Sequence, residues 1–355
     1  MQPDLTIAIC AYNAVSRIEP VIRALGNQRV SRETQWEFLF LDNASTDGTA
    51  EFVRKLAEEV HLPVRIIHEP RPGKVFAIRD AVREAAAPIL SFVDDDNVVP
   101  DNWVEGLLSF MNQHPRAGII GPRILPVFED PASRPPDFDE KYAVALAVRD
   151  MGPAPLRLVP PAHDGPPGAG MTGRTSLFRT ILFDVTCRLV GHKGNQLGSG
   201  EDSEIALIAH RLGWELWYVP VLRMGHVLPP RRLNETYLHR LIAEGARAEP
   251  WLNYLRGKRT RQSRWHYAIR GVTNLQTSVK MRGLAILRKD NASQYQFWAD
   301  LYKNRGLGYL DLAQKYPFAK FESSLASATA AAPAAGAAPA GRSVAIERNK
   351  LDSAA

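Results

Sequence analysis

Three consecutive aspartates, Asp94-Asp95-Asp96, directly follow the apolar run from Ile89 to Val93. So many like charges beside a segment typical of a buried strand are electrostatically costly unless a cation or ordered hydrogen-bond donors compensate them. The carboxyl ends of strands are also the places where open α/β sheets bind their ligands. The pattern therefore predicts a divalent cation, Mn²⁺ or Mg²⁺, at this position, and a solvated acidic turn is the alternative.

A second acidic pair, Glu201-Asp202, follows a glycine-rich stretch (Gly191, Gly194, Gly198, Gly200) and opens a predicted helix. A carboxylate in the first turn of a helix stays ionised at neutral pH, as a general base must. The alternative is that these acids only complement the helix dipole. Asp42 ends another predicted strand, so we expect its carboxylate in the same crevice as the three aspartates, although turn capping is also typical of such an acid.

Two cations and a histidine complete the candidate groups. Lys74 and Arg79 lie five positions apart around the start of one predicted helix, where both side chains can approach a pyrophosphate. Exposed cations are also common on amphipathic helices. His226 follows a later predicted strand, and a lone histidine is more often a structural hydrogen-bonding group than a metal ligand. The adjacent Arg231 and Arg232 are further cations for a diphosphate.

The elements that must position these groups alternate between strand and helix along the first 125 residues. Predicted strands cover residues 5–10, 36–41, 64–67 and 89–93, and predicted helices cover 17–25, about 52–60 and 75–86. This alternation predicts an α/β fold whose doubly wound, mainly parallel sheet is flanked by helices.

The rest of the chain has a different pattern of residues and predicted elements. Ten prolines lie between Pro126 and Gly170, and a long segment with few strand signals is typical of a functional lid. Two further predicted strands cover residues 171–174 and 215–219, and the pattern is helical beyond about residue 244. We therefore predict an α/β domain over 1–245, a basic helical extension over 246–322, and a disordered Ala/Pro-rich tail over 323–355.

The composition, with 45% hydrophobic and 23% charged residues, is ordinary for a globular protein. No signal peptide and no apolar stretch of membrane-spanning length is visible. The two cysteines, Cys10 and Cys187, do not suggest a disulfide framework. We therefore expect a cytoplasmic protein.

The net charge of +6 is unevenly distributed, because fourteen Lys or Arg but three acids lie between Trp251 and Lys320. The same segment contains large aromatic residues, among them Trp251, Trp265, Tyr267 and Trp298. Such a segment is suited to peripheral contact with an anionic membrane, here the inner face of the cell membrane, or with an anionic acceptor. A solvated face on a basic protein is the alternative. Since no nucleic-acid-binding motif accompanies the charge, nucleic acid is not an expected partner.

Five segments in sequence resemble the motifs of family 2 glycosyltransferases, over roughly residues 5 to 245. They are the strand from Ile7 that ends in Tyr12-Asn13, Leu41 to Thr49, Gly73-Lys74 with Arg79-Asp80, Asp94 to Asp96 as the DxD motif, and Gly200 to Glu204 as the ED motif. One departure is Asp80, where the family more often has Asn. A single motif of this kind is weak evidence, whereas five in the same order and spacing are specific.

The resemblance implies a GT-A fold and a metal-dependent, inverting transfer of a sugar from a nucleoside-diphosphate sugar to a glycan or lipid-linked acceptor in polysaccharide biosynthesis. It implies that Asp96 ligates the metal, that Asp95 reaches the ribose or the metal, and that Asp94 orients the turn. His226 matches a position where some members have a further metal ligand.

The resemblance also implies roles around the nucleotide and the acceptor. Asp42 accepts a hydrogen bond from the base, with Tyr12 stacked near it, and Arg79 faces the diphosphate. Asp202 is the general base, and Glu201 positions the acceptor. We expect a UDP-sugar as donor, with guanine and thymine nucleotides as alternatives.

Two other functions are compatible with such a fold. A nucleotidyltransferase also uses a doubly wound sheet and metal-binding acids, but it normally has a glycine-rich phosphate loop after the first strand, where this chain has Ala11 to Val15. A sugar-nucleotide-binding protein without turnover is the other alternative. The presence of both Asp96 and Asp202 argues against it.

Overall fold

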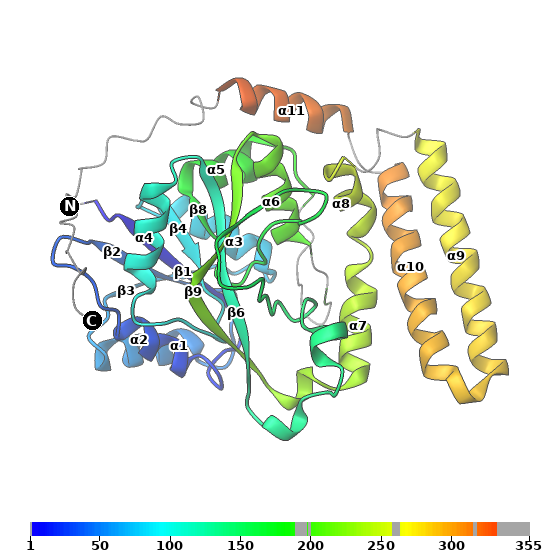
Figure 1. The fold of residues 1–355 in the computed structure, drawn as a ribbon, viewed down its shortest axis with the longest axis horizontal. Helices are drawn as coiled ribbons and strands as arrows, with labels where there is room; N and C mark the ends of the chain where they lie inside the picture. Colours follow the sequence, from blue (N-terminus) through cyan, green and yellow to red (C-terminus); the bar gives the residue numbers. More distant parts are fainter. Residues whose placement is uncertain (1, 189–196, 198–199, 258–262, 315–317, 332–355) are drawn as a thin grey trace, which may run out of the picture.

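The computed structural model describes residues 2–188, 197, 200–257, 263–314 and 318–331 (Figure 1). The elements in its first half are β1 (Leu5–Ala11), α1 (Glu19–Gly26), β2 (Trp36–Asp42), α2 (Thr49–Glu59), β3 (Val64–His68), α3 (Lys74–Glu84), β4 (Ile89–Phe92), β5 (Asn97–Val98), α4 (Trp103–Gln113) and β6 (Ala117–Phe128). They are followed by β7 (Leu156–Leu158), β8 (Thr172–Arg174), α5 (Thr175–Arg179), α6 (Glu201–Arg211), β9 (Glu215–Leu228), α7 (Glu235–Gly245), α8 (Glu249–Leu255), α9 (Arg264–Leu287), α10 (Ala292–Gln314) and α11 (Phe318–Ala331).

The strands of the described residues form one mixed sheet in the order β3-β2-β1-β4-β8-β6-β9-β5, with β7 also paired to β9. The pairs β3–β2, β2–β1, β1–β4 and β6–β9 are parallel, while β8 runs antiparallel between β4 and β6. The predicted α/β sheet with flanking helices is therefore confirmed. Its parallel first half is the part that the alternating strand and helix signals cover, and the antiparallel β8 makes the whole sheet mixed.

Alternate residues of the central strands enter two hydrophobic cores, because side chains of a strand point to opposite faces of the sheet. Ile7 and Phe40 lie in the core beneath α1, α2 and α4. Ala8, Leu39 and Leu41 lie in the core shared with α3, α5 and α6. This burial on both faces explains why β1 and β2 are continuous apolar runs, as in the parallel strands of α/β proteins. Their carboxyl ends are the points where polar residues begin.

The C-terminal helices continue the second core. Figure 1 shows α10 between α9, at the outer edge of the molecule, and α7 and α8. Trp251 and Tyr254 of α8 pack with Phe318 and Phe321 of α11, with ring centroids 4.9 to 6.3 Å apart. Trp251 and Tyr267 are therefore buried rather than placed on a basic outer surface. None of the described helices combines the length and the apolar composition needed to cross a membrane.

Helix α11 corrects the predicted start of the disordered tail. Residues 323–331 are helical, and Phe321, Leu325 and Ala328 are buried on one side of α11. They lie at spacings of four and three residues, which places them on one helix face. The rest of the predicted tail, 332–355, lies outside the described residues.

The proline-rich segment has more regular structure than the sequence predicted. Its first residues complete β6, and Leu156–Leu158 forms β7. Phe138 and Leu146 are buried in a separate small core with Leu238 of α7. Its end, at Gly168, lies beside α6, so the segment contributes to the crevice that the strand ends form.

Candidate active site

The loop after β4 directs its first two aspartates to two different cations. The Lys74 Nζ atom donates to Asp94 Oδ1 at 2.9 Å. The Arg17 guanidinium donates to both oxygens of Asp95, at 3.0 and 2.6 Å. Burial raises the pKa of Asp95 to about 6, and Arg17 opposes this rise. Burial disfavours the charge on Lys74, yet Asp94 and the nearby Glu201 outweigh it, so that the Lys74 pKa lies above its usual value.

The third aspartate lies between two residues from a distant part of the chain. The Arg232 Nη1 atom donates to Asp96 Oδ2 at 2.7 Å, and His226 Nε2 lies 3.4 Å from the same oxygen. The antiparallel pairing of β5 with β9 explains this meeting, because Asn97 is the partner of His226 in the register. Burial opposes the charge on Asp96, but His226 and Arg232 lower its pKa well below the usual value.

Asp96 and His226 fit a divalent cation. His226 is 3% exposed, and the ring nitrogen that lies beside Asp96 is its Nε2 atom. Carboxylate oxygen and imidazole nitrogen are both ligands of Mn²⁺, and Mg²⁺ prefers the oxygens. Within the described residues no group of three or more His, Cys, Asp or Glu side chains is arranged to hold a metal. A cation here would therefore share its coordination with phosphate oxygens and water, as is common for metal–nucleotide sites.

The acidic pair of α6, Glu201 and Asp202, lies near Lys74. A small cavity of about 30 Å³ is lined by Cys10, Lys74, Asp94, Gly168, Glu201 and Asp202, among others. The cavity therefore joins the end of β1, the start of α3, the loop after β4 and the start of α6. Burial and then the adjacent Asp202 raise the pKa of Glu201 to about 7, and its Oε2 atom has no hydrogen-bond partner among the described residues.

Asp202 is held by backbone donors. Its Oδ2 atom accepts a hydrogen bond from the Gly168 N–H at 2.9 Å, and its Oδ1 atom accepts one from the Ser203 N–H at 2.7 Å. Gly200, which precedes the pair, has φ of +120°, a conformation that glycine adopts readily and other residues rarely do. The other predicted glycines of this stretch, Gly191, Gly194 and Gly198, lie outside the described residues. The carboxylate of Asp202 is partly exposed, whereas that of Glu201 is buried.

The ends of β1 and β2 bring Tyr12 and Asp42 together, because Ala11 pairs with Asp42 in the parallel register. Asp42 is 5% exposed, and its Oδ2 atom lies 3.0 Å from His68 Nδ1 at the end of β3. The Tyr12 side chain is 50% exposed. A buried carboxylate beside an exposed aromatic ring is a suitable surface for a nucleobase, since an ionised carboxylate can accept several hydrogen bonds.

Arg79 lies apart from the acids. Its guanidinium is 6.0 Å from the centre of the Phe183 ring and interacts with Cys187. A step of five residues turns about 140° around a helix, so Lys74 and Arg79 of α3 point to different sides. The structure thus brings Lys74, but not Arg79, to the aspartates.

The sequence analysis missed Arg17 and His68, whose partners are Asp95 and Asp42. The signal that could have identified Arg17 is its position, because it is a cation only a few residues beyond the end of the first strand. In the structure it also donates to the carbonyl oxygens of Tyr12 and Asn13. His68 ends β3, next to Asp42 in the register.

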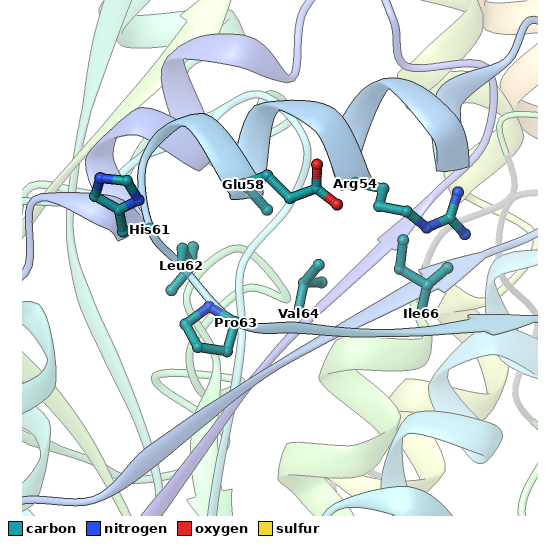
Figure 2. A pocket seen from close by; sticks show the side chains of 8 residues that line it. Arg54, Glu58, His61, Leu62, Pro63, Val64 and Ile66 are labelled. Carbon is teal, nitrogen blue, oxygen red and sulfur yellow. The ribbon is translucent and has the colours of Figure 1, made fainter.

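A larger pocket, of about 580 Å³, lies elsewhere, between α2 and β3 (Figure 2). Its lining includes Arg54, Glu58, His61 and Ile66, and it contains none of the predicted site residues. We therefore place the candidate site at the strand ends, where acids and cations converge, and not in the larger pocket.

Comparisons with known proteins bear on the family and the fold of the chain. Residues 6–177 match the family described as glycosyl transferase family 2. Glycosyltransferase AglE of Haloferax volcanii is 26% identical over 103 residues, which are 29% of this chain and 34% of that protein. Putative teichuronic acid biosynthesis glycosyltransferase TuaG of Bacillus subtilis is 26% identical over 113 residues, which are 31% of this chain and 42% of that protein. The matched region therefore spans less than half the length of these relatives.

Among solved structures, mannosyltransferase PcManGT from Pyrobaculum calidifontis, in complex with GDP-Man and Mn²⁺, aligns with a TM-score of 0.50 and 17% identity. The alignment covers 94% of this chain and 77% of that one. The common fold is the GT-A fold, with its mixed sheet and flanking helices. The chain thus contains, over residues 6–177, a glycosyltransferase domain of family 2.

Proposed function

We propose that this protein is a metal-dependent, inverting glycosyltransferase that moves a sugar from a nucleoside-diphosphate sugar to a hydroxyl group of a glycan or lipid-linked acceptor in polysaccharide biosynthesis. The observation that carries the proposal is the cavity where Asp94 of the DxD loop meets Glu201 and Asp202 of the ED motif. A donor site and a candidate base thus lie on two sides of the same crevice.

On the donor side, Asp96 and His226 would hold the cation. When bound, a divalent cation neutralises the negative charge that develops on a leaving diphosphate. Lys74 and Arg232 add positive charge at the same sheet edge, and each can exchange its aspartate partner for phosphate oxygens. Arg17 pairs with Asp95, which lies between these two aspartates in the loop.

The nucleoside would lie at the ends of β1 and β2. Asp42 accepts a hydrogen bond from the base, and Tyr12 stacks beside it. We propose a UDP-sugar as the donor. The guanine nucleotide in the PcManGT complex makes a GDP-sugar the first competitor to test.

On the acceptor side, Asp202 acts as the general base. It takes the proton of the acceptor hydroxyl while that oxygen forms a bond to the anomeric carbon, and the bond from this carbon to the diphosphate oxygen breaks. Attack from the face opposite the diphosphate inverts the configuration. The hydrogen bonds from Gly168 and Ser203 hold the carboxylate in place, and Glu201 lies beside it to position the acceptor.

The test is transfer from UDP-, GDP- and dTDP-sugars with Mn²⁺, measured as nucleoside diphosphate release. The Asp202→Asn variant keeps an oxygen that can accept from Gly168, so it should fold normally but lose about 10²- to 10⁴-fold in rate. Asp184→Asn, at an exposed aspartate elsewhere, is the matched control. Equal rates for wild type and Asp202→Asn would contradict the assignment of the base, and no release with any sugar nucleotide would contradict the proposed function.

A further inference from the structure

Helix α9 has an apolar surface on the side that faces away from the protein. We call this surface the outer face of α9, formed by Trp265, Ile269, Val272, Val279, Ile286 and Leu287. These side chains are between 49% and 80% exposed. From Trp265 to Ile286 the successive spacings are four, three, seven and seven residues, and Leu287 lies eight residues after Val279, so all six lie on one side of the helix. So many large apolar side chains in one exposed stripe are typical of an interaction site rather than of a solvated helix.

The opposite side of α9 already has its partner. Tyr267, Gly271 and Ser278 are buried, and the Ser278 hydroxyl donates to the Ala299 carbonyl of α10 at 2.7 Å. Figure 1 shows α9 at the edge of the molecule, with α10 between it and the rest. Within the described residues, therefore, packing on α10 accounts for one side of the helix and leaves the outer face uncovered.

The charge on α9 restricts what can cover the outer face. Its 24 residues contain no Asp or Glu, but they include Arg264, Arg270, Lys280 and Arg282. Arg264 and Lys280 are exposed, as are Arg288 and Lys289, which follow the helix. The next residue, Asp290, is an exposed acid, and Arg282 pairs with Asp300 of α10 at 3.4 Å, so cations outnumber acids here without excluding them. Apolar side chains that include a tryptophan, bordered mainly by cations, are typical of helices that lie in the surface of an anionic membrane.

A second copy of the chain is a poorer occupant. A pair of α9 helices would bring cations alone against cations, whereas paired helices are stabilised by opposite charges beside the seam. The seam would also contain Gln276 and Gly283, which continue the spacing of the outer face and leave a polar group and a gap at core positions. An anionic lipid surface requires neither complementary acids nor close packing of side chains.

We propose that the outer face of α9 binds the surface of a membrane that contains anionic lipid, with the helix lying parallel to that surface. The apolar side chains would enter the boundary between headgroups and acyl chains, and the flanking cations would meet lipid phosphates. The proposal is independent of the transferase assignment, because lipid binding requires neither donor nor acceptor.

The test is co-sedimentation of the full chain with vesicles of phosphatidylcholine plus phosphatidylglycerol, compared with phosphatidylcholine alone. We expect binding to the anionic vesicles that weakens at high salt, since exposed charges are then screened. Ile269→Ser combined with Ile286→Ser should lower the partition constant by about tenfold or more. Lys280→Glu changes the local charge by two units and should lower it by on the order of tenfold.

Two controls change similar groups elsewhere on the surface. Val221→Ser alters an apolar residue that is 62% exposed on β9, and Arg32→Glu reverses an exposed cation between α1 and β2. Both should bind vesicles like the wild type, and thermal melting checks that every variant folds. Absence of binding to anionic vesicles, or equal binding by the Ile269/Ile286 variant, would overturn the proposal. A concentration-dependent dimer that this variant abolishes would overturn it in favour of a second copy.

Discussion

Glu201 offers a test of the electrostatics at the start of α6. Its carboxyl group is 8% exposed and lines the cavity with Cys10, Lys74, Asp94 and Asp202. Burial, followed by Asp202, raises its pKa from 4.5 to about 7, and this net rise already includes the opposing effect of Lys74. At 1.36 kcal/mol per pKa unit, the ionised carboxylate destabilises the folded state by about 3 kcal/mol.

The sign follows from proton linkage. Between pH 4.5 and about 7 the folded state binds more protons at Glu201 than the unfolded state does. The free energy of unfolding of the wild type therefore falls as the pH rises through this interval. Glu201→Gln removes the titrating group but keeps the size of the side chain, so its stability should lack this fall. The stability advantage of the variant should grow by about 2 to 3 kcal/mol between pH 5 and pH 8.

The assay is urea unfolding of both proteins across this pH range. Glu58→Gln, at an exposed glutamate of α2, is the matched control and should follow the wild type at every pH. A difference between Glu201→Gln and wild type that does not change with pH would refute the reasoning. So would a difference that decreases toward alkaline pH.

Three further substitutions test other parts of the structure. Asp96→Asn should abolish Mn²⁺ binding in the presence of nucleoside diphosphate, measured by electron paramagnetic resonance, and Asp130→Asn, at an exposed aspartate, should not. Arg232→Gln removes the guanidinium that now donates to Asp96 Oδ2, so in the absence of nucleotide it should raise the affinity for Mn²⁺ several-fold. The same substitution should weaken the binding of nucleoside diphosphate, and a lower affinity for Mn²⁺ would contradict the competition between Arg232 and the metal. Phe321→Ala should cost about 3 to 5 kcal/mol of unfolding free energy, because it empties a fully buried site between α8 and α11, and exposed Lys320→Ala should change stability by about 0.5 kcal/mol or less in the same melting experiment.

The strands of the first half were predictable because each is a short apolar run followed by a helix-period pattern. The positions of Asp42 and of Asp94 to Asp96 at strand ends follow directly from that alternation. The partners of these acids do not. Asp96 meets His226 only because β5 and β9 pair in one register across more than a hundred residues, and nothing local in either segment indicates that pairing.

Other positions could not be derived from the sequence for similar physical reasons. Arg79 and Lys74 lie on one helix, but their difference of about 140° depends on the rotation of α3 against the sheet, which the motif alone does not reveal. The segment after residue 322 is so rich in alanine that its composition resembles a disordered tail, yet Phe321, Leu325 and Ala328 form an apolar stripe that is buried in the core shared with α8. Trp251 and Tyr267 lie among many cations in the sequence, but they face the core.

The aromatic cluster of α8 and α11 has a consequence for how the molecule can be divided and oriented. Because Trp251 and Phe321 share their core with α6, a protein cut after residue 245 would uncover apolar surface on the helix that begins with Glu201 and Asp202. Such a fragment should aggregate, so residues 1–245 should not fold as an independent domain without the C-terminal helices. The same shared core fixes the orientation of α9 and α10 relative to the sheet. A membrane bound by α9 would therefore always lie in the same orientation relative to the crevice.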